Sequence, residues 1–180
     1  MKKENIPNVL TIIRFILVPF IFIAVINHHF LIALIIFSIS ALTDILDGYI
    51  ARKYKFITDI GKLIDPLADK LTQISLLLAL TILKILPWWI LAIVFIKECV
   101  MIISASLLYS RKDVVVYSKW YGKLATVLFY LAIVCSLLIN EFNLTLPIQL
   151  DLYLYYLAIL STIFSLIMYG IKFSFKRNKT

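Results

Sequence analysis

The stretch that decides the fold runs from Asp44 to Asp69 and reads DILDGYIARKYKFITDIGKLIDPLAD. In its first half, four residues are spaced so that they fall on one face of a helix: Asp44, Asp47, Gly48 and Ala51. Arg52 lies at the edge of this face. Its second half makes a similar face in steps of four: Gly61, Asp65 and Asp69. Two helices that meet along these faces would bring four carboxylates together beside two glycines.

Carboxylates gathered at this density repel one another and need cations between them. Hard oxygen ligands suit Mg²⁺ or Mn²⁺, and not a zinc ion held by thiolates. Glycine beside such a site lets a bulky ligand approach the backbone. The pattern therefore indicates a metal-dependent diphosphate site. A solvated loop between two spans would explain Lys53, Lys55 and Asp59, but not the four motif aspartates that run into apolar helices.

The composition is that of a polytopic membrane protein. Of the 180 residues, 63% are hydrophobic and only 16% are charged, far less charge than a soluble domain of this length carries. The net charge of +8 indicates basic cytoplasmic loops that face anionic lipid, and no nucleic-acid-binding motif accompanies it. The two cysteines, Cys99 and Cys135, fall in apolar runs without metal-ligand spacing and are interpreted as packing residues.

The apolar runs predict an all-α integral membrane protein with six transmembrane helices in one domain, residues 1–180. The expected spans are 9–27, 30–50, 61–83, 88–109, 120–139 and 148–171, with a basic loop over 51–60 inside the motif. An even number of spans puts both termini on one side. Lysine and arginine concentrate at the termini, in the motif loop and around 111–123, so both termini and the site are expected on the cytoplasmic side of the plasma membrane.

The complete motif, D-x2-D-G-x2-A-R-x8-G-x3-D-x3-D, resembles the signature of the class I CDP-alcohol phosphotransferases, also called CDP-alcohol phosphatidyltransferases. These integral membrane enzymes join a CDP-linked group to an alcohol and release CMP. The resemblance implies a homodimer of that fold, with Mg²⁺ or Mn²⁺ held by Asp44, Asp47, Asp65 and Asp69. It also implies that Asp69 is the general base and that the other motif residues bind the CDP diphosphate: Gly48, Ala51, Arg52 and Gly61.

The string PNVLTIIR, residues 7–14, is similar to the PNxLTxxR start of phosphatidylglycerophosphate synthases within that family. Asn8, Thr11 and Arg14 step by three along one helical face. The resemblance implies that Asn8 and Arg14 lie near the nucleotide or the diphosphate. The alternative interpretation is an interfacial helix start whose arginine reaches back to the membrane surface.

Lys97 and Glu98 interrupt the fourth span, and ionisable residues inside a membrane are functional candidates by default. Phosphatidylglycerophosphate synthases usually carry Arg-Glu at this place and a further Arg downstream. Here Lys97 replaces the first arginine, and Ser104 and Ser106 stand where the second is expected, which leaves the acceptor alcohol open. A Lys-Glu pair satisfied by neighbouring helices is the alternative interpretation.

The string SKWYGKLAT, residues 118–126, resembles the family's S-x-x-x-G-K-x-x-T. Lys123 at the cytoplasmic mouth, with Arg111 and Lys119 before it, is a candidate for holding the phosphate of an acceptor. A lysine whose stem lies along the membrane and whose ammonium only reaches water is the alternative.

Together these resemblances imply transfer of a phosphatidyl group from CDP-diacylglycerol to glycerol 3-phosphate, which gives phosphatidylglycerophosphate and CMP. The expected partners are these substrates, membrane lipids and a second copy of the chain, and no nucleic acid. A cardiolipin synthase of the same superfamily, with phosphatidylglycerol as acceptor, is the alternative in the same class. A membrane prenyltransferase would lack the D-G-x2-A-R core, and a divalent-cation transporter would need its carboxylates near the membrane midplane.

Overall fold

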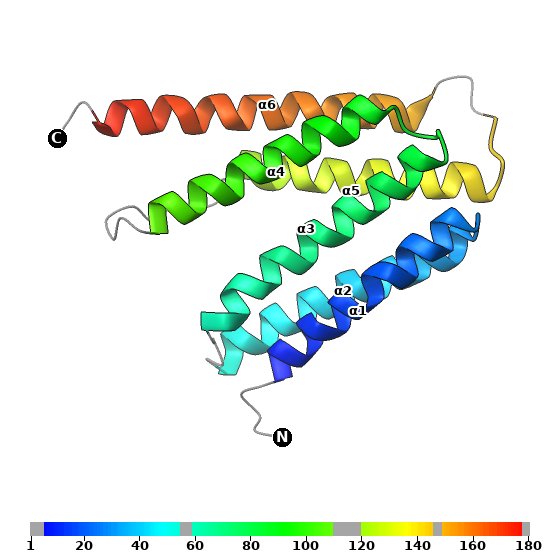
Figure 1. The fold of residues 1–180 in the computed structure, drawn as a ribbon, viewed down its shortest axis with the longest axis horizontal. Coiled ribbons are helices and arrows are strands. Elements are labelled where there is room, and N and C mark those ends of the chain that lie inside the picture. Colours follow the sequence, from blue (N-terminus) through cyan, green and yellow to red (C-terminus); the bar gives the residue numbers. More distant parts are fainter. Residues whose placement is uncertain (1–5, 55–58, 110–119, 146–148, 178–180) are drawn as a thin grey trace. The chain divides into compact units, whose positions relative to one another are not determined.

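The computed structural model of the chain describes residues 6–54, 59–109, 120–145 and 149–177, with side chains over 10–46, 53–54, 67–99, 124–145, 149–165 and at 168. Every regular element in this part of the chain is an α-helix (Figure 1). The six helices are α1 (Ile6–Ile26), α2 (Phe30–Tyr54), α3 (Asp59–Ile82), α4 (Trp88–Tyr109), α5 (Trp120–Glu141) and α6 (Leu150–Arg177). The all-α prediction is therefore confirmed for the residues described.

The helix bounds follow the predicted spans to within three residues, except inside the motif and at the end of α6, which continues to Arg177 and not to residue 171. α2 continues to Tyr54 and α3 begins at Asp59, so the basic loop predicted over 51–60 is wrong at both of its ends. The physical reason is helix propensity: alanine, arginine and lysine are strong helix formers, and residues 51–54 contain neither glycine nor proline. A helix can therefore continue past the end of an apolar run, which carries Arg52 on the same helix as the first two aspartates.

The chain divides into two compact units. Unit 1 comprises residues 1–91 and 137–144, so it holds α1, α2, α3, the first turn of α4 and the end of α5. Unit 2 comprises residues 92–136 and 145–180, with the rest of α4 and α5 and all of α6. Both halves of the motif therefore belong to unit 1.

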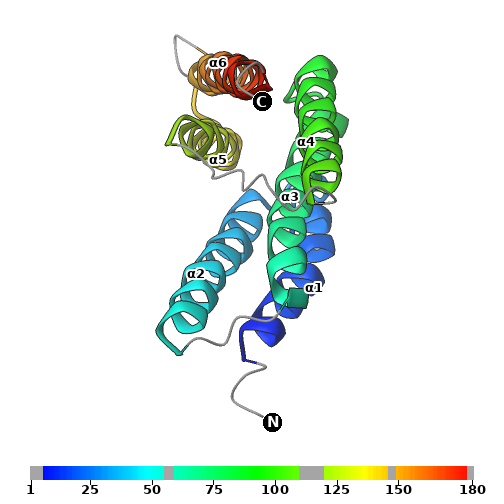
Figure 2. The ribbon, with the colours of Figure 1, turned by 90° about the vertical axis from the view of Figure 1, so that its left-hand side faces the viewer.

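In unit 1, α1 packs against both α2 and α3, and Figure 2 shows the three helices from the side. Small buried residues on all three helices let their backbones approach closely: Ala24, Ala33, Ala68 and Ala79. Larger side chains fill the rest of this core: Ile21, Val25, Phe37, Leu76, Leu77 and Leu80. On α3 the buried positions recur every three or four residues, so one face of α3 packs into the core.

The outward faces of α1 and α2 are apolar as well. Large exposed side chains follow both helices for several turns: Ile12, Ile16, Phe20 and Ile23 on α1, and Leu31, Ile35, Ile39 and Leu42 on α2. Lipid accommodates such a surface, whereas water does not. Within the described residues, one segment, Leu124–Glu141, is long and apolar enough to cross a membrane, and the apolar stretches of α1, α2 and α6 are shorter.

Three helices end in the same way, at turns whose central residue is not glycine but has positive φ: His28 (60°), Lys84 (59°) and Asn143 (47°). In each turn a backbone amide donates to the carbonyl five residues earlier: His29 to Ala24 (2.9 Å), Ile85 to Leu80 (3.0 Å) and Leu144 to Ile139 (3.0 Å). This is the Schellman ending, which usually takes glycine at the left-handed position. The ends of α1, α3 and α5 are therefore closed without any of the chain's four glycines.

In unit 2, a polar cluster joins α5 to α6. Ser136 Oγ donates a hydrogen bond to Asp151 Oδ2 at 3.0 Å and lies 3.5 Å from Tyr155 Oη. Ser136 and Tyr155 are both buried, beside the apolar core residues Phe129 and Ile133. The cluster thus gives the buried hydroxyls of Ser136 and Tyr155 a hydrogen-bond partner between the two helices.

The end of α5 caps the start of α2 within unit 1. Glu141 Oε2 accepts a hydrogen bond from the backbone amide of Leu31 at 2.9 Å. This amide lies in the first turn of α2, where backbone amides have no carbonyl partner inside the helix. A carboxylate at this position also complements the positive end of the helix dipole.

Glu141→Ala should therefore destabilise the chain by about 1 kcal/mol, the usual cost of losing a helix cap. The measurement is the thermal unfolding midpoint of the purified chain in detergent. Glu141→Gln, which keeps an acceptor oxygen at the same reach, should retain most of the midpoint. An unchanged midpoint for Glu141→Ala would contradict the capping role.

Candidate functional site

Both halves of the predicted motif lie on helices. The first half occupies the end of α2 and the second half the start of α3, so the helical spacing inferred from the sequence holds for each. Six residues of the motif are placed by their backbone only, because their side chains fall outside those described: Asp47, Gly48, Ala51, Arg52, Gly61 and Asp65. Asp44 and Asp69 are the two motif aspartates whose side chains are described.

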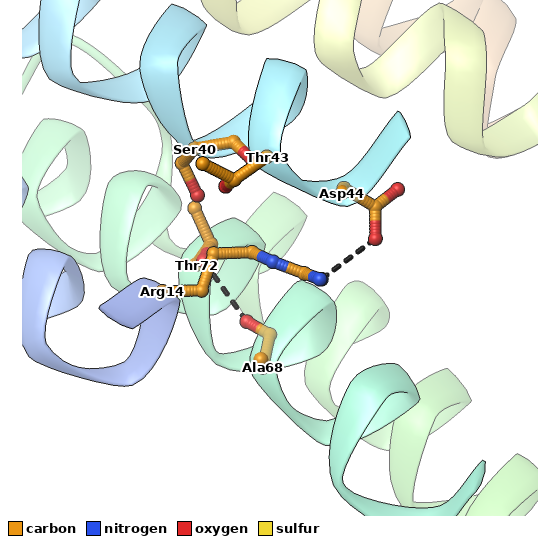
Figure 3. A network of polar contacts seen from close by, with 6 residues as sticks. All are labelled: Arg14, Ser40, Thr43, Asp44, Ala68 and Thr72. Carbon is orange, nitrogen blue, oxygen red and sulfur yellow. Dashed lines mark hydrogen bonds and ion pairs between the residues drawn. The ribbon is translucent and has the colours of Figure 1, made fainter. Parts of the chain in front are cut away.

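Arg14 of α1 reaches Asp44 of α2. The guanidinium Nη1 lies 2.7 Å from Asp44 Oδ1, and the exposed fractions of the two side chains are 2% and 46%. Figure 3 shows the arginine extended towards the carboxylate at the motif end of α2. A charge pair with one buried member is screened much less than a surface pair. Because the Arg14 side chain is buried, the alternative of an arginine that reaches the membrane surface does not fit.

Small hydroxyl residues surround Arg14 (Figure 3). Thr43 Oγ1 donates to the Ser40 carbonyl at 2.7 Å, and Thr72 Oγ1 donates to the Ala68 carbonyl at 2.9 Å. Each threonine therefore satisfies its hydroxyl within its own helix. The predicted face of Asn8, Thr11 and Arg14 is helical, with Thr11 and Arg14 buried, while the side chain of Asn8 lies outside those described.

Asp69 is partly exposed on α3, next to the buried Ala68. Sequence reasoning missed Gln73, which lies one turn further along the same helix. Gln73 is 0% exposed, and neither Nε2 nor Oε1 of its carboxamide has a hydrogen-bond partner among the described residues. The signal that could have found it is spacing, because Gln73 extends the row of Gly61, Asp65 and Asp69 by another step of four.

Gly48 and Gly61 lie inside α2 and α3, and no glycine of the described helices has positive φ. Backbone freedom therefore does not explain them. What they contribute is a missing side chain, which leaves the helix surface open to a close neighbour. This is the property that the sequence analysis assigned to them.

The predicted acceptor residues belong to unit 2. Lys97 Nζ lies 2.5 Å from Glu98 Oε1, with the side chains 7% and 2% exposed, and 5.9 Å from the centre of the Phe129 ring. Lys97 thus pairs with the carboxylate that follows it, as the alternative interpretation has it. Lys123 is on α5 with its side chain outside those described, and Arg111 and Lys119 lie outside the described residues.

The chemistry of the motif donors fits a hard divalent cation, since all four are carboxylates. Within the described side chains, no three carboxylate, histidine or cysteine groups gather as a metal site requires. Two of the four motif aspartates are not among those side chains, so the geometry of the complete donor set is not part of what the structure describes.

Comparison with known proteins places the motif in a family. The family model of CDP-alcohol phosphatidyltransferase matches residues 4–167, which includes parts of both units. A probable phosphatidylglycerophosphate synthase of Mycobacterium tuberculosis is 33% identical over 131 residues, which are 69% of this chain and 62% of that protein. A CDP-diacylglycerol–glycerol-3-phosphate 3-phosphatidyltransferase of Haemophilus influenzae is 37% identical over 175 residues, or 93% of this chain and 92% of that protein.

A probable CMP-forming cardiolipin synthase of Drosophila melanogaster is 36% identical over 101 residues, which are 54% of this chain and 31% of that protein. The chain thus spans less than two thirds of the mycobacterial relative, at 62%, but nearly all of the Haemophilus one, at 92%. The family match contains the whole motif from Asp44 to Asp69 as well as Arg14. The chain therefore belongs to the CDP-alcohol phosphatidyltransferase family.

Proposed function

We propose that the chain transfers the phosphatidyl group of CDP-diacylglycerol to glycerol 3-phosphate, which gives phosphatidylglycerophosphate and CMP for phospholipid biosynthesis. The observation that carries this proposal is the alignment with the Haemophilus influenzae transferase, because it extends over 93% of this chain and is not confined to the motif. The N-terminal string PNVLTIIR, with its buried Arg14, supports the same subclass.

The six helices act as one catalytic domain of a multi-pass protein in the plasma membrane. The family match supports one domain because it runs across both units. The exposed apolar faces of α1 and α2 support contact with lipid. The basic residues at both termini and in the motif support a cytoplasmic site. A homodimer as the working form rests on the family resemblance.

The motif aspartates are the residues that would hold Mg²⁺ or Mn²⁺: Asp44, Asp47, Asp65 and Asp69. A divalent cation bound there supplies counter-charge for the diphosphate and for the departing CMP. Arg52, one position past Ala51 on α2, adds a cation that can bind phosphoryl oxygens in bidentate fashion. Gly48 and Gly61 leave room for the cytidine and the diphosphate.

Asp69 acts as the general base. It takes the proton from the acceptor hydroxyl while that oxygen attacks the β-phosphorus, and the bond from this phosphorus to the CMP oxygen breaks. The partial exposure of Asp69 lets it pass the proton to water afterwards. Arg14 contributes through Asp44, because a buried guanidinium 2.7 Å from Oδ1 holds that carboxylate in one orientation.

The acceptor phosphate is bound by basic residues around the start of α5: Arg111, Lys119 and Lys123. One observation favours a second candidate, a cardiolipin synthase with phosphatidylglycerol as acceptor. Lys97 is buried against Glu98, so a phosphate would have to compete with that carboxylate for it. Membership of a transferase family leaves the divalent-cation transporter without a supporting observation.

An acceptor panel tests the proposed function. The purified chain in detergent, with CDP-diacylglycerol and Mg²⁺ or Mn²⁺, is offered glycerol 3-phosphate, phosphatidylglycerol, inositol phosphate or serine, and CMP release is measured. Release with glycerol 3-phosphate alone is the expected result. Release with phosphatidylglycerol alone would make the chain a cardiolipin synthase, and no release with any acceptor would sink the proposal.

Asp69→Asn should lower turnover by about 10²-fold or more, the usual contribution of a positioned general base, while binding of CDP-diacylglycerol stays largely intact. Turnover is followed by CMP release, and binding by equilibrium titration of the lipid. Asp59→Asn is the matched control, because Asp59 opens the same helix outside the motif spacing. Near-normal turnover of Asp69→Asn would show that another group is the base.

Asp44→Asn and Asp47→Asn should both lose turnover but should differ in stability. Replacing Asp44 takes the carboxylate from the ion pair with the buried Arg14, and removing one partner of a buried polar group costs about 1–3 kcal/mol. Replacing Asp47 removes one of several mutually repelling carboxylates, so without added metal its unfolding midpoint should stay unchanged or rise. The measurement is the thermal unfolding midpoint of each variant in metal-free detergent. Equal midpoints for the two variants would contradict the structural role of the Arg14 contact.

A further inference from the structure

Gln73 of α3 is fully buried, and both polar atoms of its carboxamide are without a hydrogen-bond partner in the part of the chain that is described. Such a group costs folding free energy, because it has given up water and gained nothing in exchange. The hydroxyl of its neighbour Thr72 donates to the Ala68 carbonyl at 2.9 Å (Figure 3) and so gives Gln73 Oε1 no donor. An apolar side chain of similar volume would avoid the cost, so the glutamine calls for a functional reason.

Burial narrows the choice of partner for the carboxamide. At 0% exposure, Gln73 can touch neither lipid nor a second copy of the chain, so its partner has to be a group that reaches the interior of the protein. Towards the far end of α3, the buried residues after Gln73 are apolar: Leu76, Leu77, Ala79 and Leu80. The charged residues of α3 all lie in the other direction, at the end that carries the motif, and Thr81 beyond Gln73 donates its hydroxyl to the Leu77 carbonyl of the same helix.

Helix geometry directs the carboxamide towards that end. Side chains on an α-helix lean towards its N-terminus and cover the preceding turn. The turn that precedes Gln73 carries Asp69, and residues four apart have Cβ atoms about 6 Å from each other. A glutamine side chain is long enough to bring its amide to the Asp69 carboxylate, and an asparagine is one carbon shorter.

We propose that Gln73 is a positioning residue for Asp69: when the divalent cation is bound, Gln73 donates a hydrogen bond from its Nε2 to the Asp69 carboxylate. The inference rests on the proposed function of the motif. A carboxylate that shares a cation and also takes a proton needs a fixed orientation, and a donor to one of its oxygens fixes it. Unsatisfied polar groups are tolerated where function needs them, which accounts for the cost of burying this amide.

Gln73→Leu tests the proposal in the full chain in detergent, with two readouts that do not need turnover. Mn²⁺ affinity, followed by electron paramagnetic resonance of the free ion, should fall about tenfold, as it does when a group that orients a metal ligand is lost. The thermal midpoint should stay unchanged or rise, because the unpaired buried amide is gone. In the CMP assay, kcat should fall by a similar factor while KM for CDP-diacylglycerol stays within about twofold.

Two control variants separate this role from simple packing. Thr72→Val changes the adjacent buried position, whose hydroxyl bonds within its own helix, and should leave Mn²⁺ affinity within about twofold. Gln73→Asn keeps the amide but shortens its reach, so its Mn²⁺ affinity should fall as far as that of the leucine variant. Wild-type affinity in Gln73→Asn would overturn the contact with Asp69.

A lower midpoint with unchanged Mn²⁺ affinity in Gln73→Leu would also overturn the proposal, because it would mean that Gln73 serves the fold alone. Absence of Mn²⁺ binding by the wild-type chain would overturn it together with the metal site. The Mn²⁺ readout is independent of the acceptor. A wild-type chain that binds Mn²⁺ but releases no CMP with any acceptor would therefore sink the proposed function alone, and the variants would still decide the role of Gln73.

Discussion

The structure of unit 1 depends on how a buried arginine receives a counter-charge among apolar helices. Asp44 supplies it, because its carboxylate lies 2.7 Å from the guanidinium of Arg14, which is 2% exposed. A buried charge without a counter-charge costs several kcal/mol, so Arg14 depends on Asp44. Because Arg14 comes from α1, and α1 packs against both α2 and α3, one charge pair links the helix that supports the motif to a helix that carries it.

Glycine is found in the motif and not at the three Schellman turns, where it would be usual. The three Schellman turns place histidine, lysine and asparagine at left-handed positions, where glycine is the usual choice. Gly48 and Gly61 instead lie in helices, where glycine weakens the helix by about 1 kcal/mol relative to alanine. The motif therefore carries residues that lower helix stability, and Gln73 adds a buried amide that has no hydrogen-bond partner among the described residues.

Spacing along the chain was enough to predict the helices and the two motif faces, because both depend on local periodicity. It failed at residues 51–54, where apolar length suggested a loop and helix propensity continued α2 to Tyr54. It also left Arg14 with two interpretations, since its partner is thirty residues away and is set by how α1 packs on α2. Gln73 was in phase with the motif but of another residue type. What distinguishes it from an ordinary polar position is that it is buried with no hydrogen-bond partner among the side chains that the structure describes.

The turn between α1 and α2 is only three residues long, from Asn27 to His29. It makes α1 and α2 a hairpin whose two halves carry opposite charges, Arg14 and Asp44, in contact with each other. On insertion scales, a single Arg or Asp at the centre of a membrane helix costs about 2.5–3.5 kcal/mol. In the multi-pass arrangement proposed above, two helices that enter the membrane together bring Arg14 and Asp44 as a pair of opposite charges, whereas helices that enter one by one bring each charge alone. In that arrangement the short turn favours co-insertion of the first two helices during biogenesis.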